Sequence, residues 1–177
     1  MARSATQTLG DMARSLGLMA IVIVALLFLG PSRALIFPGA DRRSPVDYRA
    51  QVTGFSQVTG LPAVVPLSLP TGWQSNAALL SSRPRLGEHL RIGWATPGER
   101  FAGLDEADGD PVALIRLVLG HRGSTVQDQV QIGPVTWDVR ASDRGERALT
   151  AGFGAVSVVL TGSATEDQLR LLAASLG

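Results

Sequence analysis

An uncharged apolar run from Leu16 to Gly30 constrains this chain more than any other feature. A helix rises about 1.5 Å per residue, so the run with one neighbour on each side spans roughly 25 Å, slightly less than the ~30 Å hydrocarbon core of a bilayer. Arg14 and Arg33 flank the run, and their long side chains can reach the headgroups and relieve part of this mismatch. The run therefore predicts a single transmembrane helix over residues 16–30.

Two other structures compete with a permanent anchor for this run. A cleaved signal peptide has an apolar core of similar length, and Ser32-Arg33-Ala34 has small residues at cleavage spacing, although arginine and a nearby proline fit such a site poorly. A helix packed on the core of a domain would need a polar stripe to face water, whereas this run is apolar on all sides. The permanent anchor is the preferred interpretation.

Two signals give opposite orientations for the anchor. Arginines are more numerous shortly after the run than before it, and by the positive-inside rule this alone would keep the C-terminal part in the cytoplasm. A long domain that follows a first hydrophobic segment is nevertheless translocated largely regardless of such charges. We therefore expect residues 1–15 to be a cytoplasmic tail, and the protein to lie in the cell membrane with its C-terminal domain extracytoplasmic.

Proline is concentrated in the chain that follows the anchor. Six of the ten prolines lie between residues 31 and 70, and proline favours extended chain over helix because it lacks a backbone donor and restricts its neighbour. Residues 31–50 are interpreted as a tether. The stretch from Gln51 to Pro70 carries many apolar side chains, so we expect it to cross the folded domain, residues 51–177, in extended form.

Alternation of apolar and polar residues predicts an antiparallel sheet in the C-terminal domain. Leu90, Ile92 and Trp94 fall on one face of a strand. His89 and Arg91 fall on the other face, which we expect to meet solvent. Further strands are predicted at residues 135–140, 149–153 and 155–161, with a hairpin turn at residues 143–146.

Two helices are predicted from their end signals. Asp110 and Pro111 form an N-cap followed by proline at the first helical position, and Gly120 ends the apolar run behind them. Thr165 and Gln168 have the spacing of a capping box before leucines at helical spacing. The sequence therefore predicts an α+β fold, with an antiparallel sheet of about five to seven strands and both helices packed on one face.

The composition excludes several kinds of chemistry. All sixteen basic residues are arginine, and the chain has no cysteine. Lysine-based catalysis, thiolate nucleophiles, disulfides and iron–sulfur clusters are therefore excluded. A formal net charge of +1 gives no electrostatic footprint for nucleic acid, and we expect no cofactor.

Few residues suit catalysis or metal binding. His89 and His121 are interpreted as surface histidines, because the sequence contains no G-x-S-x-G motif to accompany them. Four carboxylates lie between Asp105 and Asp110 without the spacing of a calcium loop, so we interpret this segment as a turn and a helix cap. No residue is assigned a catalytic, cofactor-binding or metal-binding role.

Trp73 is the candidate ligand contact. Trp94 and Trp137 lie on the apolar sides of their predicted strands and are assigned to the core. Trp73 follows Gly72 in a stretch without regular periodicity, where an aromatic ring can face a sugar or a peptide.

Several short motifs follow one another along the chain and together resemble a known family. They are Asp11-Met12 with Ser15-Leu16, Val46-Asp47-Tyr48, Leu69-Pro70-x-Gly72-Trp73, Ile92-Gly93-Trp94-Ala95-Thr96-Pro97, and V-V-L-T-G-x-A-x-x-x-x-L-x-x-L-A-x-S-L from Val158 to Leu176. The family that they resemble is an actinobacterial one of single-pass membrane proteins with a domain of unknown function. The resemblance implies one N-terminal transmembrane helix and one α+β domain, and it implies no activity, ligand or catalytic residue.

These features favour a non-enzymatic module that binds an envelope protein or another envelope component. A short proline-bearing tether limits the reach of the domain from the bilayer, which favours a partner in or near the membrane. The alternative is an envelope hydrolase with carboxylates from residues 105–110 acting with His89 or His121. Such an enzyme would need two carboxyl groups about 5–9.5 Å apart beside a cleft.

The anchor and its orientation can be tested by protease treatment of spheroplasts. We expect external protease to digest residues 34–177, because the apolar run holds the domain outside the cytoplasmic membrane. Protection of the domain would contradict the orientation. Recovery of a soluble chain that begins near Leu35 would contradict the anchor.

Overall fold

The computed structural model describes residues 45–177, which belong to one compact unit. The predicted cytoplasmic tail, the predicted transmembrane helix at residues 16–30 and most of the predicted tether lie outside the described residues. Among the helices of residues 45–177, none combines the length and the hydrophobicity needed to cross a bilayer.

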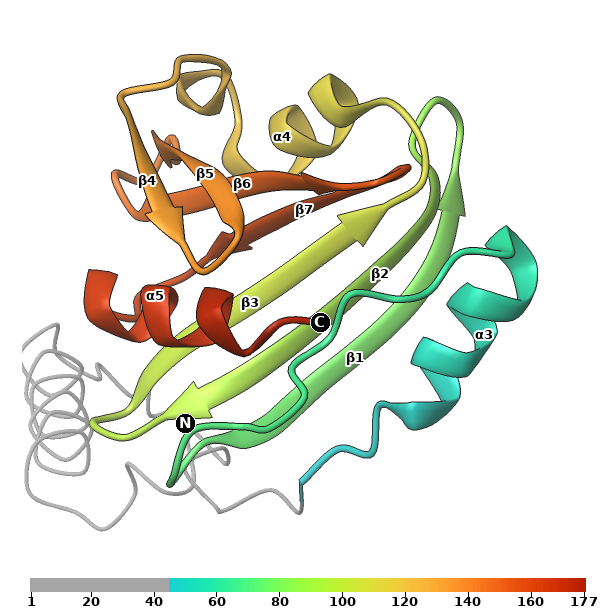
Figure 1. The fold of residues 1–177 in the computed structure, drawn as a ribbon, viewed down its shortest axis with the longest axis horizontal. Coiled ribbons are helices and arrows are strands. Elements are labelled where there is room, and N and C mark those ends of the chain that lie inside the picture. Colours follow the sequence, from blue (N-terminus) through green and yellow to red (C-terminus); the bar gives the residue numbers. More distant parts are fainter. Residues whose placement is uncertain (1–44) are drawn as a thin grey trace, which may run out of the picture. The chain divides into compact units, whose positions relative to one another are not determined.

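Seven antiparallel strands form a single sheet in the order β1-β2-β3-β7-β6-β5-β4 (Figure 1). Two meanders, β1 to β3 and β4 to β7, meet where β3 pairs with β7. The antiparallel sheet is therefore confirmed, and β7 lies at its centre. The strands are β1 (Gln74–Arg83), β2 (Gly87–Thr96), β3 (Arg100–Ala107), β4 (Asp128–Ile132), β5 (Val135–Ala141), β6 (Arg147–Phe153) and β7 (Val156–Thr161).

The helices of the described unit cover both faces of the sheet. α3 (Arg49–Thr59) and α5 (Glu166–Ser175) pack on one face, whereas α4 (Pro111–Leu119) packs on the other, followed by the short 3₁₀ helix η1 (Arg122–Ser124). The expectation that both predicted helices share one face was wrong. Both faces of β7 are apolar, so each face needs a helix to cover it. Leu160 belongs to the core cluster that includes α5, and its neighbour Val159 belongs to the cluster that includes α4.

The predicted helix ends are confirmed. Asp110 accepts a hydrogen bond from the Val112 N–H at 2.9 Å and caps α4. Thr165 and Gln168 form the reciprocal capping box of α5. Local side-chain chemistry therefore fixes where both helices begin.

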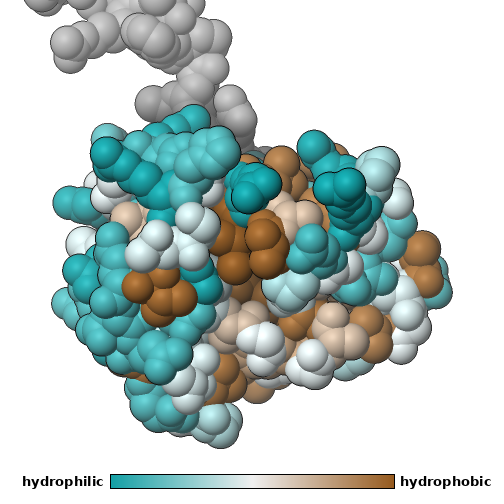
Figure 2. Space-filling view, turned by 90° about the horizontal axis from the view of Figure 1, so that it is seen from above, coloured by the Kyte–Doolittle hydropathy of each residue, from teal (hydrophilic) through white to brown (hydrophobic). Residues whose placement is uncertain are grey.

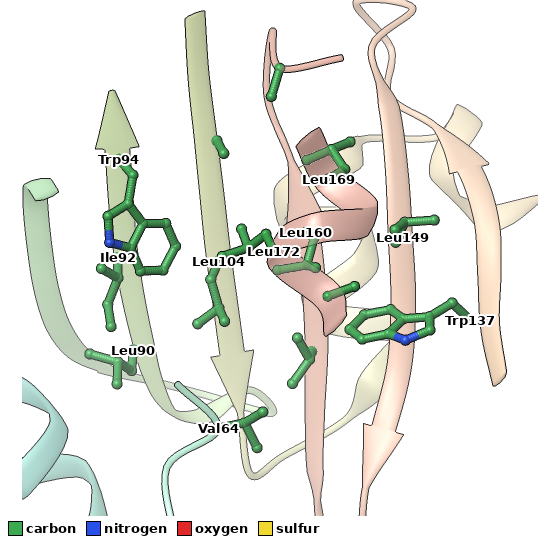
Figure 3. Close-up of a cluster of buried hydrophobic side chains, with 14 of the residues drawn as sticks. Val64, Leu90, Ile92, Trp94, Leu104, Trp137, Leu149, Leu160, Leu169 and Leu172 are labelled. Carbon is green, nitrogen blue, oxygen red and sulfur yellow. The ribbon is translucent and has the colours of Figure 1, made fainter. Parts of the chain in front are cut away.

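The larger hydrophobic cluster lies between the sheet and the layer formed by α3 and α5 (Figure 3). Trp94 and Trp137 are both fully buried in it, as expected. Tyr48 packs edge-on against Trp94 with ring centroids 6.1 Å apart, and the Val46 N–H donates to Ser75 O at 3.0 Å. Val46 and Tyr48, at the end of the predicted tether (residues 31–50), therefore belong to the folded unit.

The expectation of extended chain throughout residues 51–70 was wrong, because α3 occupies its first part. No proline lies between Pro45 and Pro62, so nothing in that interval prevents a helix. Phe55 is fully buried against the sheet and supplies the tertiary contact that holds the helix. Gly60 ends α3 in the left-handed conformation at φ 71°.

Burial of α5 against the core can be tested at Leu172, which is 0% exposed. We expect Leu172→Ala to lower the free energy of unfolding by about 2–5 kcal/mol, because it leaves a cavity beneath the helix. Leu171 is 56% exposed, so Leu171→Ala is the matched control and should change stability by only about 0.5 kcal/mol. Denaturant unfolding measures both values, and equal effects would show that α5 is not packed as described.

Candidate functional site

A pocket of about 370 Å³ lies beside the C-terminal half of α4. Figure 2, seen from above Figure 1, shows hydrophobic side chains gathered in the middle of this end of the molecule between hydrophilic flanks. Phe101 of β3 and Leu117 and Val118 of α4 supply the apolar part of the pocket lining. The charged lining residues are Arg91 of β2, together with Asp143, Arg144 and Glu146 of the β5–β6 turn.

Arg91 links the pocket to a buried carboxylate. It lies opposite Asp105 in the β2–β3 pairing, and its Nη1 atom is 3.8 Å from Asp105 Oδ1. The Arg91 side chain is 46% exposed, while that of Asp105 is 0% exposed. Within residues 45–177 the Arg91 guanidinium makes no hydrogen bond, so its N–H groups are available to a ligand.

His89 is buried, so its interpretation as a surface histidine was wrong. The residue is 4% exposed, and its Nε2 atom lies 2.8 Å from Asp105 Oδ1. Its predicted position on the polar face of β2 is correct, but α4 packs on that same face of the sheet against β3 and β7. A period of two shows which side chains share a face and does not show which face a distant helix covers.

Ser81 is a residue that the sequence analysis missed. It lies opposite His89 in the β1–β2 pairing, and both Ser81 Oγ and His89 Nδ1 are buried without a hydrogen-bond partner in the described unit. Serine, histidine and aspartate thus share one face of neighbouring strands. No hydrogen bond joins Ser81 to His89 within residues 45–177, and the pocket lining contains neither of them, so no assembled nucleophile faces the pocket.

The carboxylates between Asp105 and Asp110 are separated by the fold. Asp105 and Glu106 lie on β3 rather than in a turn, and strand alternation points them to opposite faces of the sheet. Asp108 accepts a hydrogen bond from the Glu88 N–H at 2.7 Å, and Asp110 caps α4. The prediction of a turn and a cap is therefore confirmed for residues 108–110 only. Among residues 45–177, no three metal-ligating side chains gather into a group that could hold an ion.

Glu106 is a buried acid on the face of the sheet opposite the pocket. It is 0% exposed, and burial raises its pKa to about 8, although the hydrogen bond from the Val64 N–H to Oε2 at 2.8 Å acts in the other direction. At neutral pH this side chain is therefore mainly the uncharged acid. The contact connects the segment after α3 to the C-terminal end of β3.

Asp143 holds one end of the pocket together. The backbone N–H groups of Arg122 and His121 donate to its two carboxylate oxygens at 2.8 and 3.2 Å and lower its pKa. His121 is exposed, as expected. Asp143 also donates its own N–H to Leu119 O at 2.8 Å, which ties the β5–β6 turn to the end of α4.

The structure places Trp73 in the larger core cluster rather than in the pocket. Trp73 is 8% exposed, so little of its ring surface faces solvent. The residues that line the pocket come from the consecutive elements β2, β3 and α4 and, much later in the sequence, from the β5–β6 turn and the end of β7. The one signal for them in the sequence is the polar side of β2, on which Arg91 lies.

Fold and pocket together define an α+β domain with one seven-stranded antiparallel sheet, helices on both faces and a pocket of small-ligand size beside one helix. The chain belongs to the family described as protein of unknown function DUF4245, which matches residues 5–176. A search of curated proteins gave no match. The expected membership in a family of unknown function is confirmed, whereas the actinobacterial origin and the single-pass topology stay predictions.

The buried acid predicts an unusual dependence of stability on pH. The folded-state pKa of Glu106, about 8, exceeds its ordinary value of 4.5, so between these values the folded protein holds a proton that the unfolded chain has released. The free energy of unfolding should therefore fall by a few kcal/mol as the pH rises from about 5 to about 8. Urea unfolding across this range measures the slope.

Glu106→Gln is the matched variant for this measurement, because its amide oxygen can still accept the Val64 N–H bond. We expect the stability of this variant to vary much less over the same pH range. Parallel profiles for the two proteins would show that Glu106 is not the group responsible.

Proposed function

We propose that this protein is a membrane-anchored, extracytoplasmic binding module and not an enzyme, and that its ligand or partner occupies the pocket beside α4. The observation that carries the proposal is the pocket itself. Its lining combines apolar side chains of β3 and α4 with polar and charged ones, among them Arg91, whose guanidinium is not engaged by hydrogen bonds within the described residues. A concave apolar surface with a few well-placed polar groups is typical of ligand sites.

The carboxylates near the pocket favour binding over acid–base catalysis. Both oxygens of Asp143 already accept backbone N–H groups, and its lowered pKa suits a structural anion rather than a proton donor. Glu106 has the raised pKa that a general acid requires, but it lies on the opposite face of the sheet from Arg91. A two-carboxylate mechanism would need such an acid beside the pocket.

The proposed anchor restricts where a partner can be. With a transmembrane helix at residues 16–30, the fourteen residues from 31 to 44 span at most roughly 50 Å when fully extended. The pocket would then stay close to the outer surface of the cell membrane. This geometry favours an envelope protein or another envelope component as the partner.

Site-specific photocrosslinking in native membranes tests the proposal. A photoreactive residue at Leu117, which lines the pocket and is 44% exposed, should capture a defined partner or envelope component. Val112 lies on the same helix, is 59% exposed and is not part of the pocket lining, so the same residue placed there is the matched control. Equal capture at both positions, or none at Leu117, would contradict the proposal.

A hydrolase is the second candidate, because the His89–Asp105 pair and the neighbouring Ser81 bring the residue types of a catalytic triad onto one face. The purified full-length protein should be assayed with ester and glycoside substrates. The binding-module proposal predicts no turnover above background. Turnover that is lost in His89→Gln would favour the hydrolase instead.

A further inference from the structure

We propose that Arg91 binds a carboxylate, and that the pocket takes a small monocarboxylate with an aliphatic body, such as an N-acylated aliphatic amino acid. The inference rests on the proposed binding function and names the chemistry of its ligand. The carboxylate of a peptide's last residue has the same chemistry, so the experiment below distinguishes these two sources.

Arg91 is held in place by a buried carboxylate. Asp105 is fully buried and fixed by His89 at 2.8 Å, and it lies 3.8 Å from one side of the Arg91 guanidinium. This attraction places the positive charge at the wall of the pocket while the N–H groups stay available. Two parallel N–H groups of an arginine match the two oxygens of a carboxylate.

The charges of the other lining residues select the kind of anion. Asp143 and Glu146 also line the pocket, and Arg144 is the second lining arginine. A doubly charged phosphate would meet these two carboxylates and the nearby Asp105. A single negative charge suffers less repulsion, so the site favours a monocarboxylate.

The size and the apolar part of the pocket suit a small ligand with an aliphatic body. A volume of about 370 Å³ lies near the lower end of the range for ligand sites, about 300–1,000 Å³. Phe101, Leu117 and Val118 contribute apolar surface to the same pocket as Arg91. A ligand with an aliphatic side chain next to its carboxylate can contact both the apolar surface and the guanidinium.

Calorimetric titration of the full-length protein in detergent micelles tests the inference with three small probes. N-acetyl-leucine should bind at least about tenfold more tightly than N-acetyl-leucinamide, which lacks the charge, because the amide cannot form charge-assisted bonds to Arg91. Inorganic phosphate should bind more weakly than N-acetyl-leucine. Equal binding of acid and amide, or tighter binding of phosphate, would overturn the inference.

Variants of Arg91 assign the preference to this residue. Arg91→Gln should abolish the preference for the acid, and Arg91→Lys should reduce it several-fold, because lysine keeps the charge beside Asp105 but lacks the planar pair of donors. Arg83→Gln is the matched control, since Arg83 is exposed and is not part of the pocket lining. Melting temperatures of all variants show which of them fold. An unchanged acid preference in a folded Arg91→Lys or Arg91→Gln protein would overturn the assignment.

A short peptide that ends in leucine identifies the source of the carboxylate. Tighter binding of this peptide than of N-acetyl-leucine supports a polypeptide end, and equal binding supports a small molecule. The failure of this inference is separate from failure of the binding function. If no carboxylate probe binds while the photoreactive residue at position 117 still captures a partner, the proposed ligand class is wrong and the proposed binding function stands.

Discussion

The pairing of β3 with β7 joins the two halves of the sheet, and the rest of the fold depends on it. Five residue pairs, from Gly103↔Thr161 to Ala107↔Ser157, connect the first meander to the second. The larger core cluster crosses this junction through Leu104 and Leu160, and the smaller one crosses it through Ala107 and Val159. Both layers of helices therefore pack over the same junction, and each helix layer stabilises the pairing beneath it.

Two acids are buried beside this junction, and the fold compensates each of them differently. Asp105 has two side-chain partners, His89 with its Nε2 atom at 2.8 Å and Arg91 with its Nη1 atom at 3.8 Å from Asp105 Oδ1. Glu106 meets a single backbone N–H, from Val64, so burial favours its uncharged form and its pKa rises to about 8. Asp105 and Glu106 are consecutive residues of β3, so their side chains lie on opposite faces of the sheet. Arg91, which contacts Asp105, is part of the pocket wall.

The shape of the pocket follows from the place where α4 ends. Gly120 has φ 76°, in the left-handed region, and a side chain at this position would collide with the carboxylate of Asp143. That close approach allows the β5–β6 turn to bond to the helix end through Asp143 and Leu119. The end of the helix, the turn and the outer part of β3 then surround one volume. A glycine that itself lines the pocket thus allows this close approach.

Features that depend on neighbouring residues were readable from the sequence, whereas features that depend on coverage by distant elements were not. Asp110 and Thr165 mark their helix ends because capping involves residues within one turn, and the alternation around Trp94 and Trp137 assigns both to the core. The same alternation placed His89 on a polar face but carried no information that this face would be buried, with α4 packed on it against β3 and β7. Prolines around α3 concealed a helix that is held by tertiary burial of Phe55. The contact between Arg91 and Asp105 crosses the β2–β3 hairpin, and the pairing register of these two strands sets it. The pocket beside it exists because the fold brings this hairpin together with the end of α4, the β5–β6 turn and the end of β7, and no local pattern encodes that meeting.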